Sequence, residues 1–84
     1  MKFNIVKNID IEKLDEELLK FPITGEQYPY IFINENTARE LVTNIIVEGR
    51  LHDITIKDKC MLGEYQGNKV FIDNTKAFGE VELR

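Results

Sequence analysis

Residues 28–49 read YPYIFINENTARELVTNIIVEG and hold the signals for a strand, a helix start, a helix and a helix stop in direct succession. Tyr30 to Ile33 is a short apolar run bounded by Pro29 and Asn34, which is typical of a strand covered on both faces. Apolar residues then recur at the spacing that lines one helix face, at Ala38, Leu41, Val42, Ile45 and Ile46. Gly49 fits the left-handed position that ends such a helix. The stretch therefore predicts a strand followed directly by an amphipathic helix.

The residues before this stretch predict another strand and helix. Lys2 to Lys7 alternates polar and apolar side chains, which indicates a strand. Asp10 can cap a helix by accepting from the free N–H groups of its first turn, and the inward side of that helix carries Ile11, Leu14, Leu18 and Phe21. Pro22 ends the helix, because proline has no N–H to donate and pushes the preceding residue out of the helical region.

From Arg50 onward the apolar residues recur with the period of two that is typical of strands. A tight turn at Gln66 to Asn68 predicts a hairpin between strands near Leu62–Tyr65 and Lys69–Asp73, and a final strand follows. We therefore expect one small α+β domain over residues 1–84 with the order β-α-β-α-β-β-β. Its sheet is expected to be mainly antiparallel, with both helices on one face because their apolar stripes need a shared cover.

The composition favours a protein partner. The chain has 84 residues and a formal net charge of −4. Lys and Arg bind phosphate backbones by neutralising their charge, so this acidic balance disfavours nucleic acid. Polar residues interrupt the first apolar ones, and no apolar run approaches the length that spans a membrane. We therefore expect a cytoplasmic protein with no membrane partner.

Four acidic residues on or beside the last strands could form a patch that binds a partner: Glu64, Asp73, Glu80 and Glu82. Carboxylates with a spacing of two form a ladder, whereas a divalent metal needs a close cluster, so we expect no metal site. The alternative is a solvated sheet face on which Lys69, Lys76 and Arg84 balance the acids.

Two tyrosines beside predicted turns, Tyr28 and Tyr65, are further candidates for contact with a partner. Tyrosine suits interfaces because it combines a large apolar area with a polar tip, although such residues also pack over sheet edges. The final strand ends at Arg84 with no predicted cover, so its edge could pair with another chain and form a homo-oligomer. In the alternative, lysines such as Lys69 and Lys76 guard this edge.

No pattern of catalytic residues surrounds the one cysteine and the one histidine. Cys60 and His52 would form a nucleophile and base only if strands brought them together, with Asp53 or Asp58 orienting the imidazole. A buried Cys60 and an exposed His52 are the simpler expectation. One cysteine and one histidine cannot supply the four ligands of a structural zinc site. We therefore expect neither an enzyme nor a cofactor.

Residues 65–74, YQGNKVFIDN, and residues 78–83, FGEVEL, resemble the ends of small uncharacterised proteins encoded by phages and prophages of low-GC Gram-positive (Firmicutes) bacteria. The run YPYIFIN at residues 28–34 and the helix after it are also similar to that group, so the resemblance covers residues 28–84. These motifs are structural and carry no functional residue with them. The resemblance implies an accessory protein of a phage or mobile element that binds a host protein, with inhibition of a defence protein as one such role.

Two other functions are alternatives. The succession of a strand, a helix and a glycine-containing hairpin also resembles a subdomain of tailed-phage capsid proteins, which implies a structural or assembly role. A third expectation is an oligomer that binds a small ligand such as a nucleotide in a pocket between subunits. Interaction with a host protein is the leading expectation of the three.

Overall fold

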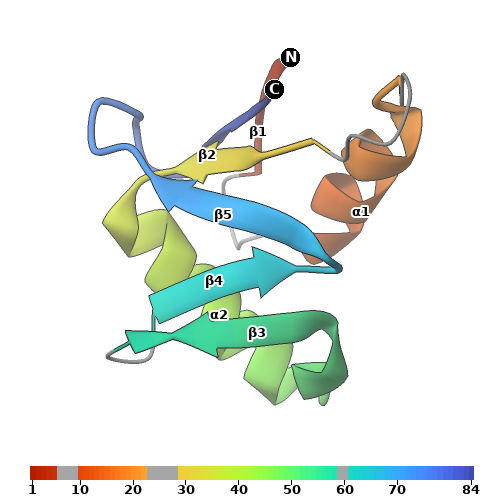
Figure 1. The fold of residues 1–84 in the computed structure, drawn as a ribbon, viewed down its shortest axis with the longest axis vertical. Coiled ribbons are helices and arrows are strands. Elements are labelled where there is room, and N and C mark those ends of the chain that lie inside the picture. Colours follow the sequence, from red (N-terminus) through yellow and green to blue (C-terminus); the bar gives the residue numbers. More distant parts are fainter. Residues whose placement is uncertain (6–9, 23–28, 59–60) are drawn as a thin grey trace.

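Two helices and six strands follow one another as β-α-β-α-β-β-β-β in the computed structural model, which describes residues 1–5, 10–22, 29–58 and 61–84 (Figure 1). The elements are β1 (Lys2–Asn4), α1 (Ile11–Lys20), β2 (Ile31–Ile33), α2 (Glu35–Val47), β3 (Ile54–Lys57), β4 (Met61–Tyr65), β5 (Asn68–Ile72) and β6 (Glu80–Leu83). A short 3-10 helix, η1 (Leu51–Asp53), precedes β3.

The strands form one sheet in the order β1-β6-β2-β5-β4-β3. All neighbours are antiparallel except β2 and β5, which run parallel. The parallel pair arises because α2, β3 and β4 lie between β2 and β5 in the chain. They return the chain to the end of the sheet at which β2 begins, as a parallel connection requires. The expected α+β class and mainly antiparallel sheet are confirmed.

Two details of the expected sheet are wrong. Four strands rather than three follow α2, because the chain reverses between Lys57 and Met61 and pairs β3 with β4 as separate antiparallel strands. The C-terminal strand β6 is not an edge either, since it lies between β1 and β2 and pairs with both. Within the described residues, the edges of the sheet are β1 and β3.

Side-chain caps fix where both helices begin. The carboxylate of Asp10 accepts a hydrogen bond from the N–H of Lys13 at 3.0 Å, as predicted. The side-chain oxygen of Asn34 accepts one from the N–H of Thr37 at 2.7 Å. Such bonds satisfy N–H groups that have no partner in the first turn of a helix. Strand β2 therefore passes into α2 through the single residue Asn34, and Gly49 (φ +70°) follows the end of the helix.

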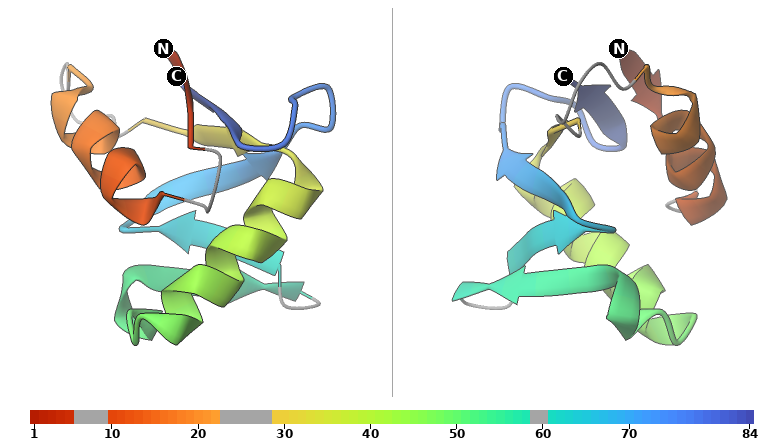
Figure 2. Two further views of the ribbon diagram at one scale, coloured as in Figure 1. Left: turned by 180° about the vertical axis from the view of Figure 1, so that it is seen from behind. Right: turned by 45° about the vertical axis from the view of Figure 1, so that its right-hand side comes forward.

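Both helices cover the same face of the sheet, and the hydrophobic core lies between the two layers (Figure 2). The core residues from the helices are Ile11, Leu14, Ala38, Leu41 and Ile45, and those from the strands include Ile31, Ile33, Leu62, Val70, Val81 and Leu83. Phe32, between two buried isoleucines of β2, is only half-buried on the other face. The expectation that this strand is covered on both faces is wrong, because both described helices lie on the opposite side of the sheet.

Candidate functional site

The face of the sheet that the helices leave uncovered is the candidate functional surface, and we call it the open face. The register places its side chains: Phe32 pairs with Phe71 and Glu82, Glu64 pairs with Lys69 and Thr55, and residues two apart on a strand share a face. The open face runs across all six strands through Lys2, Asn4, Glu80, Glu82, Phe32, Phe71, Lys69, Glu64, Thr55 and Lys57.

Three aromatic rings lie together at the centre of the open face, and we call Tyr30, Phe32 and Phe71 the aromatic cluster. Phe32 stacks on Phe71 with ring centroids 5.3 Å apart, and Tyr30 meets Phe71 edge to face at 5.4 Å. The guanidinium of Arg84 lies 4.1 Å from the centre of the Phe32 ring. Tyr30 is 48% exposed and Phe71 is 42% exposed. The cluster therefore holds its rings in a fixed arrangement while presenting apolar area to the outside.

Three of the four predicted acidic residues surround one buried lysine beside the aromatic cluster. The side chain of Lys76 is only 7% exposed, and its ammonium lies 2.5 Å from Glu82 and 3.9 Å from Asp73. Glu82 also accepts two hydrogen bonds from Arg84, at 3.0 and 3.1 Å. Glu80 accepts a hydrogen bond from the N–H of Ala77 at 3.3 Å. Lys76 thus pairs with Glu82 and Asp73, and Arg84 pairs with Glu82, whereas Lys69, also named in the alternative of a balanced sheet face, forms no ion pair in the described part of the chain.

The hydrogen bonds around Lys76 favour the charged forms of Glu82, Asp73 and Lys76. Hydrogen bonds from Arg84 and then Lys76 lower the pKa of Glu82 to about 2. Hydrogen bonds from Thr75 lower the pKa of Asp73, and the hydrogen bond to Glu82 raises the pKa of Lys76. Asp73, Glu80 and Glu82 therefore form a charged rim beside the aromatic cluster rather than a free acidic patch.

The predicted contact residue Tyr65 lies in the interior. Its side chain is fully buried, and its hydroxyl donates to the Asp15 carboxylate of α1. Arg50 donates to the same carboxylate and to the Tyr65 oxygen, at 3.1 Å each, and to Asp53 at 2.7 Å. Burial, and then the hydrogen bond to Asp15, raise the pKa of Tyr65. Tyr65 therefore ties α1 to β4 and is not available to a partner, so its prediction as a contact residue is corrected.

Two other predicted positions fall outside the described residues. They are Tyr28, a candidate contact residue, and Cys60, the candidate nucleophile. His52 lies exposed in η1, with Nε2 3.5 Å from the Asp53 carboxylate. Among the residues that the structure describes, no three His, Cys, Asp or Glu side chains come together to hold a metal ion. No described helix combines the length and the apolar character needed to cross a bilayer.

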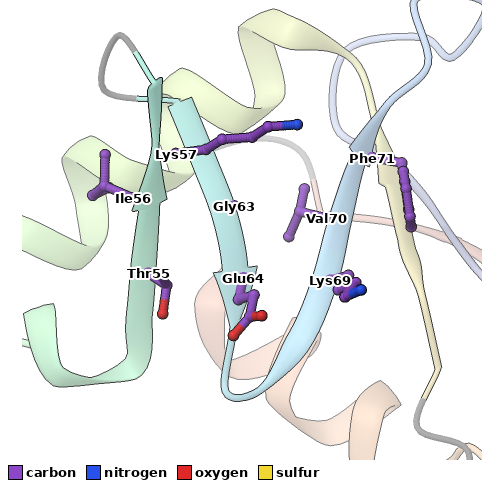
Figure 3. A pocket seen from close by; sticks show the side chains of 8 residues that line it. All are labelled: Thr55, Ile56, Lys57, Gly63, Glu64, Lys69, Val70 and Phe71. Atoms are coloured by element: carbon purple, nitrogen blue, oxygen red, sulfur yellow. The ribbon is translucent and has the colours of Figure 1, made fainter.

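A cleft of about 410 Å³ adjoins the aromatic cluster, between β4 and β5 (Figure 3). Its lining includes Thr55 and Lys57 from β3, Gly63 and Glu64 from β4, and Lys69 and Phe71 from β5. Glu64, the fourth predicted acidic residue, therefore lies in the wall of this cleft and apart from the other three. Figure 3 shows the Lys57 side chain extending from β3 across β4 toward Val70.

The sequence predicts strands at Phe32 and Phe71 but does not identify these two residues as the centre of an exposed face. A signal for Phe71 was present, because it alternates with Val70 and Ile72 and so occupies the polar side of its strand. For Phe32 there is no such signal, since an unbroken apolar run does not indicate which side is covered.

Comparisons of the chain with protein-family models, with curated proteins and with solved structures gave no match.

Proposed function

We propose that this protein is a binding module that acts by contact with another protein, and that the open face around the aromatic cluster is the contact surface. The observation that carries the proposal is the pair of exposed rings, Tyr30 and Phe71, in contact with each other on the open face. Protein interfaces are enriched in aromatic residues at their centre because rigid rings bury a large apolar area at a low entropic cost.

The surroundings of the aromatic cluster fit the same function. Charged side chains flank it on both sides, with Glu82 and Arg84 on one side and Lys69 and Glu64 on the other. An apolar centre with a polar rim is the usual arrangement of a protein–protein contact. The opposite arrangement, in which carboxylates form the centre, is disfavoured because Lys76 and Arg84 already neutralise Glu82.

The resemblance to small phage and prophage proteins supports a partner in the bacterial host. An accessory protein of a mobile element benefits the element by altering a host process, and inhibition of a defence protein is the role that we favour. Direct binding through one contact surface is the simplest means of such inhibition.

The test is capture of proteins from the lysate of a low-GC Gram-positive bacterium with three tagged baits: the wild type, Phe71→Ser and Leu19→Ser. Leu19 is the matched control, because it is an exposed apolar residue, 88% exposed, on α1. We expect one host protein to be enriched by the wild type and by Leu19→Ser and lost with Phe71→Ser. Circular dichroism of each bait verifies that it is folded.

Two results would overturn the proposal. One is a host protein that is captured equally by the wild type and by Phe71→Ser, which would place the contact elsewhere on the molecule. The other is an eluate in which no protein is enriched by a folded wild-type bait, which would favour self-assembly or small-ligand binding.

A further inference from the structure

The strands β4 and β5 are paired only beside their connecting turn. The pairs are Glu64 with Lys69 and Tyr65 with Asn68. Beyond them β5 pairs with β2, and β4 pairs with β3. Figure 1 shows the two strands separating from the hairpin, with α2 passing behind the opening. The edge of β4 at residues 61–63 therefore faces the cleft instead of a neighbouring strand.

A bulge at Gly63 explains the opening. Thr55 pairs with Glu64 and Ile56 with Leu62, so Gly63 is an extra residue on β4 with no partner on β3. Bulges bend a strand and increase its twist, which here turns β4 away from β5. A Cβ atom on Gly63 would lie 3.2 Å from both the Thr55 carbonyl oxygen and the Lys57 Cβ. Glycine is therefore the residue that this close approach of β3 to β4 tolerates best.

Two lysines at the cleft are without an ion-pair partner among the described residues. They are Lys57 and Lys69, and both line the cleft. Glu64 is the one acidic residue in this lining, and Asp58 lines the adjoining hollow, so two lysines and two carboxylates border the whole cleft. Val70 and Phe71 supply the apolar surface that β5 adds to the lining.

A second hollow of about 260 Å³ shares Lys57, Val70 and Phe71 with the first and extends along β4 to Met61. Together they form a long, open cleft along a strand edge. Small-molecule sites usually enclose most of their ligand, whereas an extended peptide can add to a free strand edge through backbone hydrogen bonds.

We propose that the cleft binds an extended segment of the protein partner, which adds to the free edge of β4 and places a carboxylate between Lys57 and Lys69. This inference rests on the proposed function, because the cleft continues from Phe71 of the aromatic cluster. The partner backbone pairs with residues 61–63, and its alternate side chains lie over Val70 and against the lysines.

The test is titration of ¹⁵N-labelled protein with two capped peptides, TVEVT and TVKVT, and with sodium phosphate, followed by amide chemical shifts. We expect TVEVT to shift the amides of Gly63, Lys69 and Val70, and TVKVT to bind at least threefold more weakly. In the double variant Lys57→Glu, Lys69→Glu, the affinity for TVEVT should fall roughly tenfold, as expected when two attractive charge pairs become repulsive. Lys13→Glu on α1, an exposed lysine, is the control for charge and should leave the affinity unchanged.

Three outcomes would overturn this inference: no shift of these amides at millimolar TVEVT, equal shifts with both peptides, or the same shifts with phosphate. The third would show that the cleft takes anions without an added strand. Capture experiments separate this inference from the proposed function. A partner lost with Phe71→Ser but retained by the Lys57→Glu, Lys69→Glu variant would leave the open face as the contact surface and remove the cleft from it.

Discussion

The Phe32 ring stacks on the Phe71 ring across the parallel strands β2 and β5, with centroids 5.3 Å apart and planes 18° apart. This contact links two segments that are distant in sequence and forms the centre of the proposed contact surface. The two rings hold each other in place. A partner that covers Phe71 therefore costs this side chain little further conformational entropy.

The stacking should appear as a coupling between the two positions. Aromatic pairs contribute about 0.5–1.5 kcal/mol beyond the area they bury. In a double-mutant cycle of Phe32→Leu and Phe71→Leu, we expect the urea unfolding free energies to show a coupling of that size. Losses that simply add would contradict a specific contact between the rings.

The hydroxyl of Tyr65 should stabilise the fold. Tyr65→Phe removes the donor to Asp15 and the acceptor for Arg50 without changing the packing of the ring. We expect the free energy of unfolding to fall by about 1.5–3 kcal/mol, the range for a hydrogen bond to a charged group. Tyr30→Phe is the matched control, because Tyr30 is exposed, and it should change stability by less than about 0.5 kcal/mol. Equal effects of the two substitutions would contradict the buried network.

Glu82 should contribute to stability at neutral pH and lose that contribution in acid. Its pKa is lowered from 4.5 to about 2 in the folded protein, so the folded state holds the proton more weakly than the unfolded state does. The contribution is complete above about pH 4.5 and disappears as the pH falls toward 2. Melting temperatures of the wild type and Glu82→Gln between pH 7 and pH 2 should therefore differ most at pH 7 and converge in acid. A constant difference over this range would be incompatible with ionised Glu82 pairing with Arg84 and Lys76.

Leu41 should be essential to the core. It is fully buried on α2 between the helix and the sheet. Leu41→Ala is expected to cost about 2–5 kcal/mol, whereas Leu19→Ala at an exposed position should cost less than about 0.5 kcal/mol. For a chain of this length, whose total stability is on the order of 4–13 kcal/mol, the first change removes a large fraction. Urea denaturation of the two variants measures both values.

The edges of the sheet should keep the protein monomeric. The edge strands β1 and β3 carry Lys2 and Lys57, and charged lysines on an edge oppose pairing with another chain. Sedimentation velocity should give one monomeric species from micromolar to millimolar concentration. A sedimentation coefficient that rises with concentration would instead support a homo-oligomer through an edge strand.

Local features of the fold could be predicted from the sequence, and long-range features could not. The strand and helix at residues 31–47 follow from the periodicity of apolar residues, which acts between near neighbours. The position of β6 between β1 and β2 depends on pairing of chain ends, and alternation at Val81 and Leu83 is the same for an edge and a central strand. Nothing near Tyr65 in sequence indicates that its hydroxyl meets Asp15, fifty residues away.

The candidate site shows the same division. The rim residues Glu80 and Glu82 could be assigned to one strand face from their spacing, and Lys76 and Arg84 could be named as balancing cations. That Lys76 pairs with Glu82 depends on the turn before β6. Phe32 and Phe71 come from segments almost forty residues apart and meet only because β2 and β5 pair in parallel. The register of such a pair is set by the whole fold, so the aromatic cluster was beyond reach from sequence alone.

The most direct test of the central claim is the affinity of the captured partner for the wild type and for Phe71→Ser, measured by biolayer interferometry on purified proteins. If the aromatic cluster is the centre of the interface, its loss should weaken binding roughly 30-fold or more, the size of effect seen at interface hot spots. Leu19→Ser should bind as the wild type does. An affinity of Phe71→Ser within twofold of the wild type would contradict the assignment of the open face as the contact surface.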